Sequence, residues 1–330
     1  MSLLYLEEQG ATVGIEANRI KIVAADFTRS VPLEAVEGIT VLGHIQLTTP
    51  CIEMCLKKGI PVSFFSKGGK YFGRLQSTGH VNVERQRQQC KLYDSVFSVE
   101  LAKQILRGKI YNQRILLSRY ARSKKVDVEK NLIEMKNYIS KIENCPTVLS
   151  IMGYEGQSAK EYFDGLSRVI EPDFTFHGRN RRPPKDPFNS LISLGYSILM
   201  NEIYVKLEER GLNPYFGFIH RDQEKHPTLA SDLMEEWRPV IVDSLAMSLL
   251  NGHEMTKEHF QWDYDNPGCF LTHDGMKIFL NKFEKKLRTE VQYLPGSALS
   301  FRRARTHQVN LLIQAVETED AKLYEPICIR

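Results

Sequence analysis

The sequence predicts an α+β protein in which a small β-rich N-terminal domain is followed by a larger all-helical domain. Three observations lead to this fold class. A chain of 330 residues with 42% apolar content is long enough to bury two separate cores. Its first eighty or so residues contain short alternating runs bounded by turn residues, as strands do. Beyond about residue 96, apolar residues recur at helical spacing over long stretches.

The N-terminal part is expected to contain strands and one short helix. Residues 13–16 and 20–23 alternate in polarity on either side of a short connection, which predicts a hairpin. A helix then begins at Thr49, the predicted N-cap before a proline in the first turn, and ends at Gly59. The apolar run 60–65 predicts a central strand, and two glycines after Lys67 turn the chain into a further strand at 71–74.

A polar stretch separates this part from the helical part. Residues 79–89 include Arg85 and Arg87 and show no sustained apolar period, so we interpret this region as an interdomain connection. The predicted division is a β-rich domain at 1–84, a linker at 85–95 and a helical domain at 96–330. In the helical domain the spacing predicts helices at 96–120, 133–141, 149–169, 188–209, from about Asp232 onward, 273–288 and 302–318.

The formal net charge is only +4, but the charges are unevenly distributed. Residues 101–125 contain eight basic side chains, among them Lys109, and no acidic one. Such a segment can neutralise several nucleic-acid phosphates with salt-sensitive affinity. The alternative is a solvated helix face that keeps the protein in solution, and charge alone does not decide between the two.

Several classes of protein are disfavoured. The six cysteines show no paired short spacing, so neither a disulfide framework nor a zinc site is indicated. No apolar run approaches the length of a membrane span, and the chain does not open with a charged start followed by an apolar signal region. We therefore expect a cytoplasmic protein without membrane association.

Four acidic and imidazole side chains form a candidate divalent-metal site. Glu155 lies in a helical pattern, His220 follows an apolar segment, and Asp232 and Glu235 share a further helix. At 100° per residue, Asp232 and Glu235 lie about 60° apart, opposite the apolar residues, so both can point into one cavity. Glu236 is only about 40° from Asp232, so this geometry does not exclude it. Carboxylates with an imidazole suit Mg²⁺ or Mn²⁺, which polarise phosphoryl oxygens.

These residues also have ordinary structural interpretations. Two glycines, Gly153 and Gly156, flank Glu155, and each costs about 0.5–1 kcal/mol in a helix interior relative to alanine. They indicate close approach of a neighbouring backbone, which simple helix packing would explain. A single histidine after an apolar segment, such as His220, is more often a satisfied core residue than a ligand.

The residues around these positions carry a resemblance to a known family. Blocks 153–156, 179–196 and 217–239 contain the candidate ligands and an arginine-rich loop, and N-terminal blocks 60–66 and 68–75 precede them. Together they resemble the CRISPR-associated integrase family, the larger, metal-dependent subunit of the spacer-acquisition complex, nearly from end to end. The resemblance implies a DNA endonuclease and integrase that works by phosphoryl transfer. In the implied reaction, the 3′-hydroxyl of a foreign DNA fragment would attack a phosphodiester at the CRISPR repeat boundary.

The resemblance also implies roles for particular residues and partners. Glu155, His220 and Glu235 would be catalytic metal ligands, with Asp232 as a second or water-bridged ligand. Some family members carry two aspartates here, and the longer Glu235 carboxylate should still reach the metal. The implied substrate is double-stranded DNA, as spacer fragments and as the repeat. The implied partners are a second copy, bound through the β domains, and a small ferredoxin-like CRISPR-associated protein.

Arginine-rich segments are the expected DNA contacts, because planar guanidinium groups suit phosphate. A stiff basic loop with the helix after it, and a basic cluster near the C-terminus, supply the candidates Arg179, Arg181, Arg182, Asn189, Arg302 and Arg303. For the loop, a disordered surface segment is the alternative interpretation.

Two other functions stay open at this point. A metal-dependent nuclease that acts on branched DNA in repair would share the same site, and only an integration assay separates it from an integrase. A non-catalytic DNA-binding scaffold is the second alternative, and metal binding without turnover would favour it.

Overall fold

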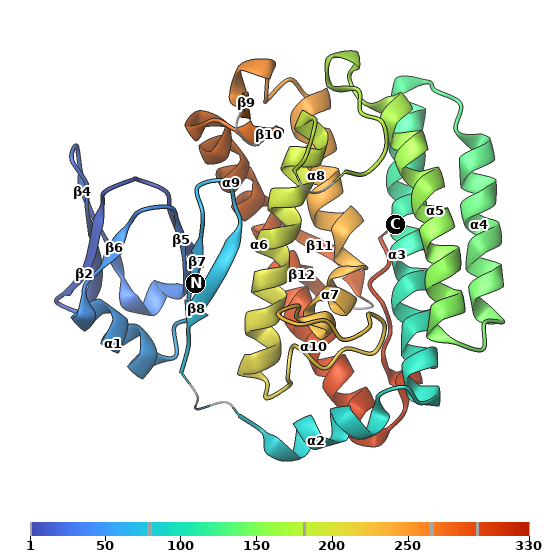
Figure 1. Cartoon of the computed structure of the whole chain (residues 1–330), viewed down its shortest axis with the longest axis horizontal. Helices are drawn as coiled ribbons and strands as arrows, with labels where there is room; N and C mark the ends of the chain where they lie inside the picture. The colour runs from blue at the N-terminus through green and yellow to red at the C-terminus, as the bar shows by residue number, and fades with distance from the viewer. Residues whose placement is uncertain are drawn as a thin grey trace. The chain divides into compact units, whose positions relative to one another are not determined.

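The structure is a computed structural model that describes residues 2–77, 79, 81–180, 183–263, 267–294 and 297–329. The chain divides into two compact units, Met1–Val81 and Asn82–Arg330 (Figure 1). The first unit is rich in strands and the second is mostly helical, which confirms the α+β fold class. No helix in the described residues combines the length and apolarity that a membrane crossing requires.

The first unit combines two sheets with the helix α1. Its elements are β1 (Ser2–Leu6), β2 (Thr12–Glu16), β3 (Arg19–Val23), β4 (Thr28–Pro32), η1 (Leu33–Ala35), β5 (Val36–Leu42), β6 (Gln46–Leu47), α1 (Thr49–Lys58), β7 (Val62–Phe65) and β8 (Tyr71–Leu75). One sheet has the order β1-β5-β7-β8 and the other the order β4-β3-β2-β6, in which β2 and β3 form the predicted hairpin. Val13, Ile20, Val41 and Cys51 represent the core that both sheets and α1 share.

Local signals set the bounds of α1. The N-cap is Thr48 rather than the predicted Thr49, because the Thr48 side chain accepts a hydrogen bond from the backbone N of Cys51 at 3.4 Å. The helix ends as predicted at Gly59, whose φ of 68° lies in the left-handed region that glycine adopts without strain.

The second unit contains the long helices and two short hairpins. Its elements are α2 (Val83–Leu92), α3 (Val96–Lys124), α4 (Glu129–Glu143), α5 (Val148–Val169), η2 (Pro172–Phe174), α6 (Pro187–Glu209), α7 (Thr228–Met234), the π-helical segment η3 (Arg238–Asp243), α8 (Ser244–Asn251), η4 (Lys257–His259), β9 (Phe260–Asp263), β10 (Gly268–Leu271), α9 (His273–Arg288), β11 (Glu290–Leu294), β12 (Ser297–Ser300), α10 (Phe301–Thr318) and η5 (Ala321–Leu323).

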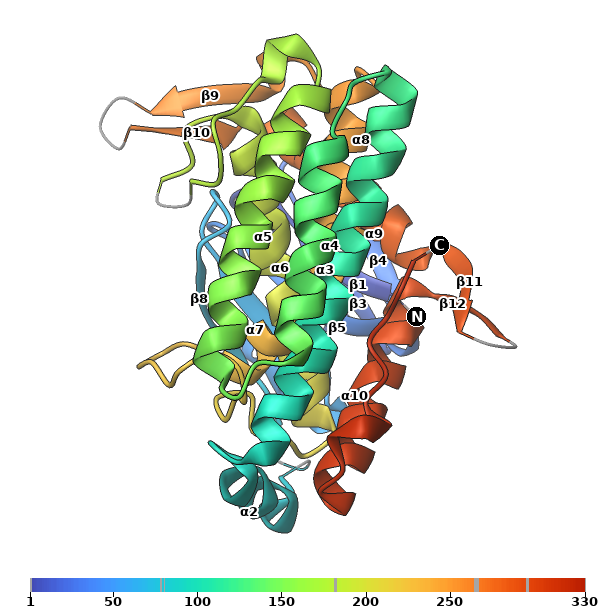
Figure 2. The ribbon, with the colours of Figure 1, turned by 90° about the vertical axis from the view of Figure 1, so that its right-hand side faces the viewer.

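Helices α3, α4 and α5 pack against one another, and each contacts the other two (Figure 2). The close approach of α3 and α5 is at Gly165, where a Cβ would lie 2.7 Å from a Leu117 methyl carbon. The glycines beside Glu155 do not serve this purpose, contrary to expectation, because a Cβ at Gly153 or Gly156 would meet nothing within 4 Å. Helix α6 packs against α7, η3 and α8, and it carries buried apolar residues on all its sides.

Two expectations, for the predicted linker and for the predicted helical domain, need correction. The stretch interpreted as a linker, 85–95, is largely helical. Asn82 caps α2 by accepting a hydrogen bond from the Arg85 backbone N at 3.0 Å, and Gln89 and Leu92 are buried. The second unit is also not all-helical, because β9–β10 and β11–β12 form antiparallel hairpins. These strands are only four or five residues long, too short for a clear alternating pattern.

Candidate metal centre

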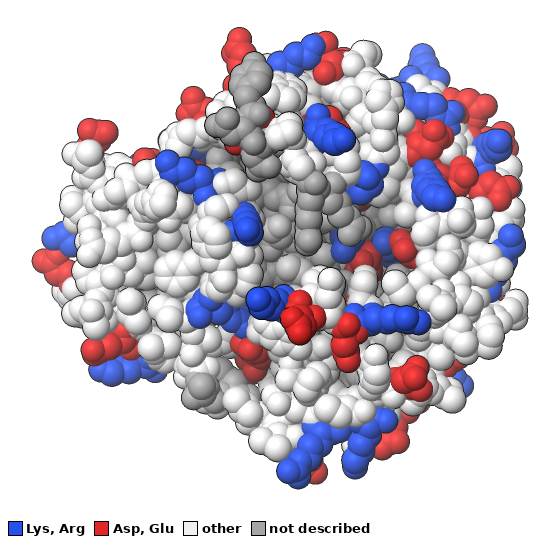
Figure 3. Space-filling view, in the orientation of Figure 1, with Lys and Arg blue, Asp and Glu red and all other residues white. Residues whose placement is uncertain are grey.

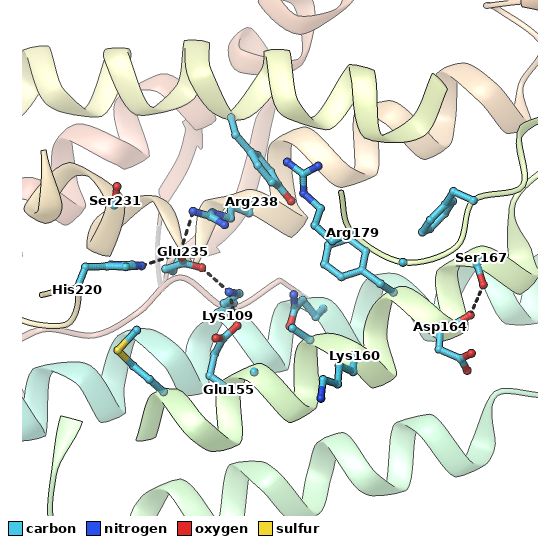
Figure 4. Close-up of a pocket in the computed structure, with 18 of the residues that line it drawn as sticks. Lys109, Glu155, Lys160, Asp164, Ser167, Arg179, His220, Ser231, Glu235 and Arg238 are labelled. Carbon is cyan, nitrogen blue, oxygen red and sulfur yellow. Dashed lines mark hydrogen bonds and ion pairs between the residues drawn. The ribbon is translucent and has the colours of Figure 1, made fainter. Parts of the chain in front are cut away.

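A pocket of about 1180 Å³ opens in the second unit among α3, α5, α6 and the segment that leads from α7 into η3. Its lining includes Glu155, His220 and Glu235, together with Lys109 and Arg238 (Figure 4). Glu155 comes from α5 and Lys109 from α3. His220 precedes α7 in the sequence, and Glu235 and Arg238 follow it. Three of the four predicted ligands therefore line one cavity, although they are far apart in the sequence.

The ammonium group of Lys109 lies between two of these carboxylates. Its Nζ is 2.5 Å from Oε1 of Glu155 and also contacts Oε2 of Glu235 (Figure 4). Lys109 is only 6% exposed, so this ion pair is shielded from solvent. The sequence grouped Lys109 with surface basic residues, whereas the structure uses it as the counter-ion of the candidate ligands.

His220 is held by Asp232, which lies behind it. Oδ1 of Asp232 accepts from Nδ1 of His220 at 2.6 Å and from the His220 backbone N at 3.0 Å. Oδ2 accepts from the backbone N of Phe218 at 2.7 Å and of Ile219 at 3.0 Å. With Nδ1 donating to the carboxylate, Nε2 carries the lone pair whenever the ring is neutral, and this atom lies 3.7 Å from Oε1 of Glu235. Both Asp232 oxygens are thus engaged within the protein.

The charges at the centre shift its ionisation. Burial alone would raise the pKa of Glu235, but the nearby cations Arg238, Lys109 and His220 outweigh it and lower the pKa to about 2. Burial also disfavours the charged form of His220, yet the hydrogen bond and charge of Asp232 raise its pKa above the ordinary value. Glu235 is therefore an anion at neutral pH, which is the form that binds a cation.

Two arginines and a tyrosine form the adjoining wall of the pocket. Arg238 is 3.0 Å from Oε1 of Glu235, and its guanidinium lies 4.7 Å from the ring centroid of Tyr196. The Arg179 guanidinium lies 5.5 Å from the same ring. The Tyr196 hydroxyl donates to Asp243 at 2.5 Å, which anchors the ring from behind. The sequence identified Arg179 but missed Arg238, because a single arginine beside an acidic pair carries no recognisable pattern.

Glu236, which the helical wheel could not exclude, faces away from the pocket. Its Oε1 accepts from Tyr324 Oη at 2.7 Å and from Gln308 Nε2 at 3.0 Å, and its Oε2 accepts from the Ile327 backbone N at 3.1 Å. Glu236 thus binds α10 and the C-terminal segment, and Glu235 is the carboxylate of this pair that faces the pocket.

The donor set fits a divalent cation. Two carboxylates already hold a cationic group between them, and Nε2 of His220, which can bind a metal when the ring is neutral, lies 3.7 Å from one of them. Oxygen and imidazole donors of this kind suit Mg²⁺ or Mn²⁺. In the described part of the chain, no three acidic, histidine or cysteine side chains already stand together as a metal-binding group. The Lys109 ammonium instead contacts the carboxylates of both Glu155 and Glu235.

Of the DNA contacts expected in the arginine-rich loop and the helix after it, the structure places only some at the surface of the pocket. Arg181 and Arg182 lie outside the described residues. Asn189 is fully buried and organises the loop before α6, since its side chain accepts from Arg179 at 2.8 Å and donates to the Gly178 carbonyl at 3.0 Å. It is therefore not available to DNA. Arg179 is the member of this loop that lines the pocket.

The C-terminal cluster is also corrected. Arg302 is 9% exposed and pairs with Glu284 at 2.7 Å and with Glu202 at 3.3 Å, so it belongs to the interior. Arg303 is exposed. On the face drawn in Figure 3, Lys and Arg are interspersed with Asp and Glu, so charge alone does not mark a DNA path there. Among the arginines, Arg179 and Arg238 line the pocket.

Comparisons with known proteins agree with one another. The family model of CRISPR associated protein Cas1 matches residues 4–285. The chain is 31% identical over 321 residues to a CRISPR-associated endonuclease Cas1 of Mycobacterium tuberculosis, covering 96% of this chain and 94% of that relative. A solved structure of a CAS1 protein from Thermotoga maritima matches with a TM-score of 0.82 and 25% identity, over 96% of this chain and 97% of the other.

A further match is to a chain of a solved Cas6-RT-Cas1–Cas2 complex. It has a TM-score of 0.85 and 25% identity, and covers 98% of this chain and 36% of the longer one. Both the family model and the relatives span most of the sequence, in agreement with the nearly end-to-end resemblance noted in the sequence analysis. The chain belongs to the family of the CRISPR associated protein Cas1.

Proposed function

We propose that this member of the Cas1 family is a metal-dependent DNA endonuclease and integrase that inserts foreign DNA fragments into a CRISPR repeat array by phosphoryl transfer. The observation that carries the proposal is the meeting of Glu155, His220 and Glu235 in one pocket, with arginines beside them. Membership of a family whose curated relatives are named endonucleases supports the same conclusion.

Glu155, Glu235 and Nε2 of His220 would hold the ion, which we expect to be Mg²⁺ or Mn²⁺. When bound, the ion supplies Lewis-acid polarisation of the phosphoryl group and favours the anionic form of a hydroxyl nucleophile. We assign Asp232 to orienting His220 rather than to direct ligation, because all its hydrogen bonds are to the histidine and to backbone N–H groups.

The arginines of the pocket would position the phosphodiester. Arg238 is held by the Glu235 carboxylate and the Tyr196 ring, and Arg179 lies over the same ring. A guanidinium that is already held in place loses little side-chain freedom when it binds phosphate oxygens, and it can do so in a bidentate manner. The negative charge that develops on the phosphoryl oxygens would therefore meet fixed positive groups.

The assembly is a further part of the proposal. The β-rich first unit is small, and we expect it to form a homodimer. One solved complex that contains a similar chain is described as including Cas2, and we expect a small ferredoxin-like partner of that kind here. Double-stranded DNA would be bound by the pocket arginines, with Arg303 as an additional surface contact, and largely without sequence preference.

Strand transfer of a labelled fragment into a repeat-bearing plasmid tests the proposal. Glu155→Gln, His220→Ala and Glu235→Gln should each abolish Mn²⁺- or Mg²⁺-dependent joining and cleavage while the protein stays folded. Glu161→Gln changes a carboxylate of the same helix α5 that is not among the pocket residues, and it should behave as wild type. Wild-type joining by any of the three ligand variants would disprove that residue's role.

The same assay separates the two alternatives. A repair nuclease would cleave branched DNA with the metal but would not join fragments to the repeat. A non-catalytic scaffold would bind DNA and metal and give neither product.

A further inference from the structure

Lys109 occupies the place where a cation shared by Glu155 and Glu235 would lie. Its Nζ is 2.5 Å from the Glu155 carboxylate, contacts the Glu235 carboxylate as well, and is buried (Figure 4). The two carboxylates come from different elements, α5 and the turn after α7, and Lys109 comes from a third, α3. The ammonium group therefore links three segments through one charge.

The lysine and a divalent ion exclude each other at this place. Oxygen ligands approach such an ion to about 2.0–2.2 Å. An ammonium group that contacts the same oxygens of Glu155 and Glu235 would overlap the ion and repel it. An ion bound through Oε1 of Glu155 and Oε2 of Glu235 thus requires that the Lys109 head group withdraw.

The pocket offers the lysine somewhere to go. Lys109 lines the pocket, as does Gly156, and a Cβ at Gly156 would meet nothing within 4 Å, so there is open space within the same pocket. The lysine stem is long and flexible. However, a buried ammonium that has lost its carboxylates is strongly unfavourable unless an anion replaces them. Withdrawal of Lys109 therefore depends on a negative group in the pocket.

We propose that Lys109 couples metal binding to DNA binding: it fills the cation position in the metal-free protein and transfers its charge to a strand phosphate when the ion enters. This inference rests on the proposed function, which places a phosphodiester in the same pocket. The ion and the strand then promote each other's binding, because each lowers the free energy that the other needs to separate Lys109 from the two carboxylates. This effect must be reciprocal.

Titration of the full-length protein with Mn²⁺, with and without a DNA duplex whose strands lack 3′-hydroxyl groups, tests the inference. In wild type, DNA should tighten Mn²⁺ binding about 5–150-fold, the range of typical coupling between sites. Lys109→Met should bind Mn²⁺ more tightly than wild type without DNA, and DNA should tighten its Mn²⁺ binding by a clearly smaller factor than in wild type, because only the direct contact between ion and phosphate then couples the two. Lys160→Met removes another lysine that lines the pocket, on α5, and should keep the wild-type coupling.

Melting temperatures give a readout that does not depend on activity. Lys109→Met should melt below wild type in EDTA, because the Glu155 and Glu235 charges lose their shared partner, and should gain more from Mn²⁺ than wild type does. If Lys109→Met is unfolded in EDTA, Mn²⁺ should restore its fold, and Lys109→Gln provides a second variant.

The outcomes separate this inference from the proposed function. Equal Mn²⁺ affinity and equal DNA coupling in wild type and Lys109→Met would overturn the inference alone. Wild-type protein that binds no Mn²⁺, with or without DNA, would overturn the metal-dependent function itself and reduce Lys109 to a structural ion pair.

Discussion

Replacing Asp243 by asparagine should change how the stability of the second unit depends on pH. Asp243 ends the π-helical segment η3 and is fully buried. It accepts hydrogen bonds from Tyr162 Oη at 2.8 Å and from Tyr196 Oη at 2.5 Å. Burial raises the pKa of Asp243 from 3.8 to about 6, although both hydrogen bonds and the charges of Arg238 and Arg179 oppose the rise.

The sign of the effect follows from linkage. Because the pKa of Asp243 is higher in the folded protein than in the unfolded chain, its contribution to stability is fully present below about pH 3.8 and is lost as the pH rises through about 6. At about 1.4 kcal/mol for each tenfold change in proton affinity, the full loss is about 3 kcal/mol. About 2 kcal/mol of it should fall between about pH 4.5 and pH 7.5. Asp243→Asn has no proton to lose, so this loss should be absent.

Urea unfolding in EDTA, followed by tryptophan fluorescence across this pH range, measures the difference. Both tryptophans of the chain, Trp237 and Trp262, lie in the second unit, so their signal reports that unit. Relative to wild type, Asp243→Asn should gain about 2 kcal/mol of stability from the low to the high end of the range. Asp222→Asn changes an exposed carboxylate and should follow wild type. Parallel pH curves for wild type and Asp243→Asn would refute the argument.

Further predictions concern the centre and the interior ion pairs. Asp232→Asn should weaken Mn²⁺ binding about 10–100-fold in calorimetric titration, because the carboxylate that orients the His220 ring is lost. An unchanged affinity would contradict that role. Glu202→Ala should lower the stability of the second unit by about 3–5 kcal/mol, because buried guanidinium groups on α10 lose this partner. Arg303→Ala, on the same helix but exposed, should change the stability measured in urea by less than about 0.5 kcal/mol.

Much of the helical unit could be predicted from the sequence because its helices carry their own signals. Helix α9 was predicted at its observed bounds, since apolar residues from Met276 to Leu287 keep one buried face and Thr272 caps the first turn. Glu155, His220 and Glu235 were also predicted as one set, and the structure places all three in the same pocket.

Lys109 and Arg302 show why the remainder could not be predicted. Both are basic residues on amphipathic helices, and in the sequence each resembles a surface cation. Their burial depends on acidic partners from other elements, namely Glu155 and Glu235 for Lys109, and Glu202 for Arg302. Such pairings join residues from 46 to 126 positions apart, so no local pattern reveals them. Charge that is counted along a sequence therefore overstates the basic surface.

The pocket wall depends on a backbone feature that the helical wheel could not anticipate. The wheel assumed one α-helix from Asp232 onward, but α7 ends at Met234 and η3 is π-helical. In an α-helix, residues five apart point about 140° away from each other, whereas i→i+5 bonding brings them onto the same side of the helix. Arg238 and Asp243 are five apart, and both meet Tyr196, one at its ring and the other at its hydroxyl. A regular α-helix here would separate them, so the π segment is what allows one tyrosine to be anchored by Asp243 while it supports the arginine that faces Glu235.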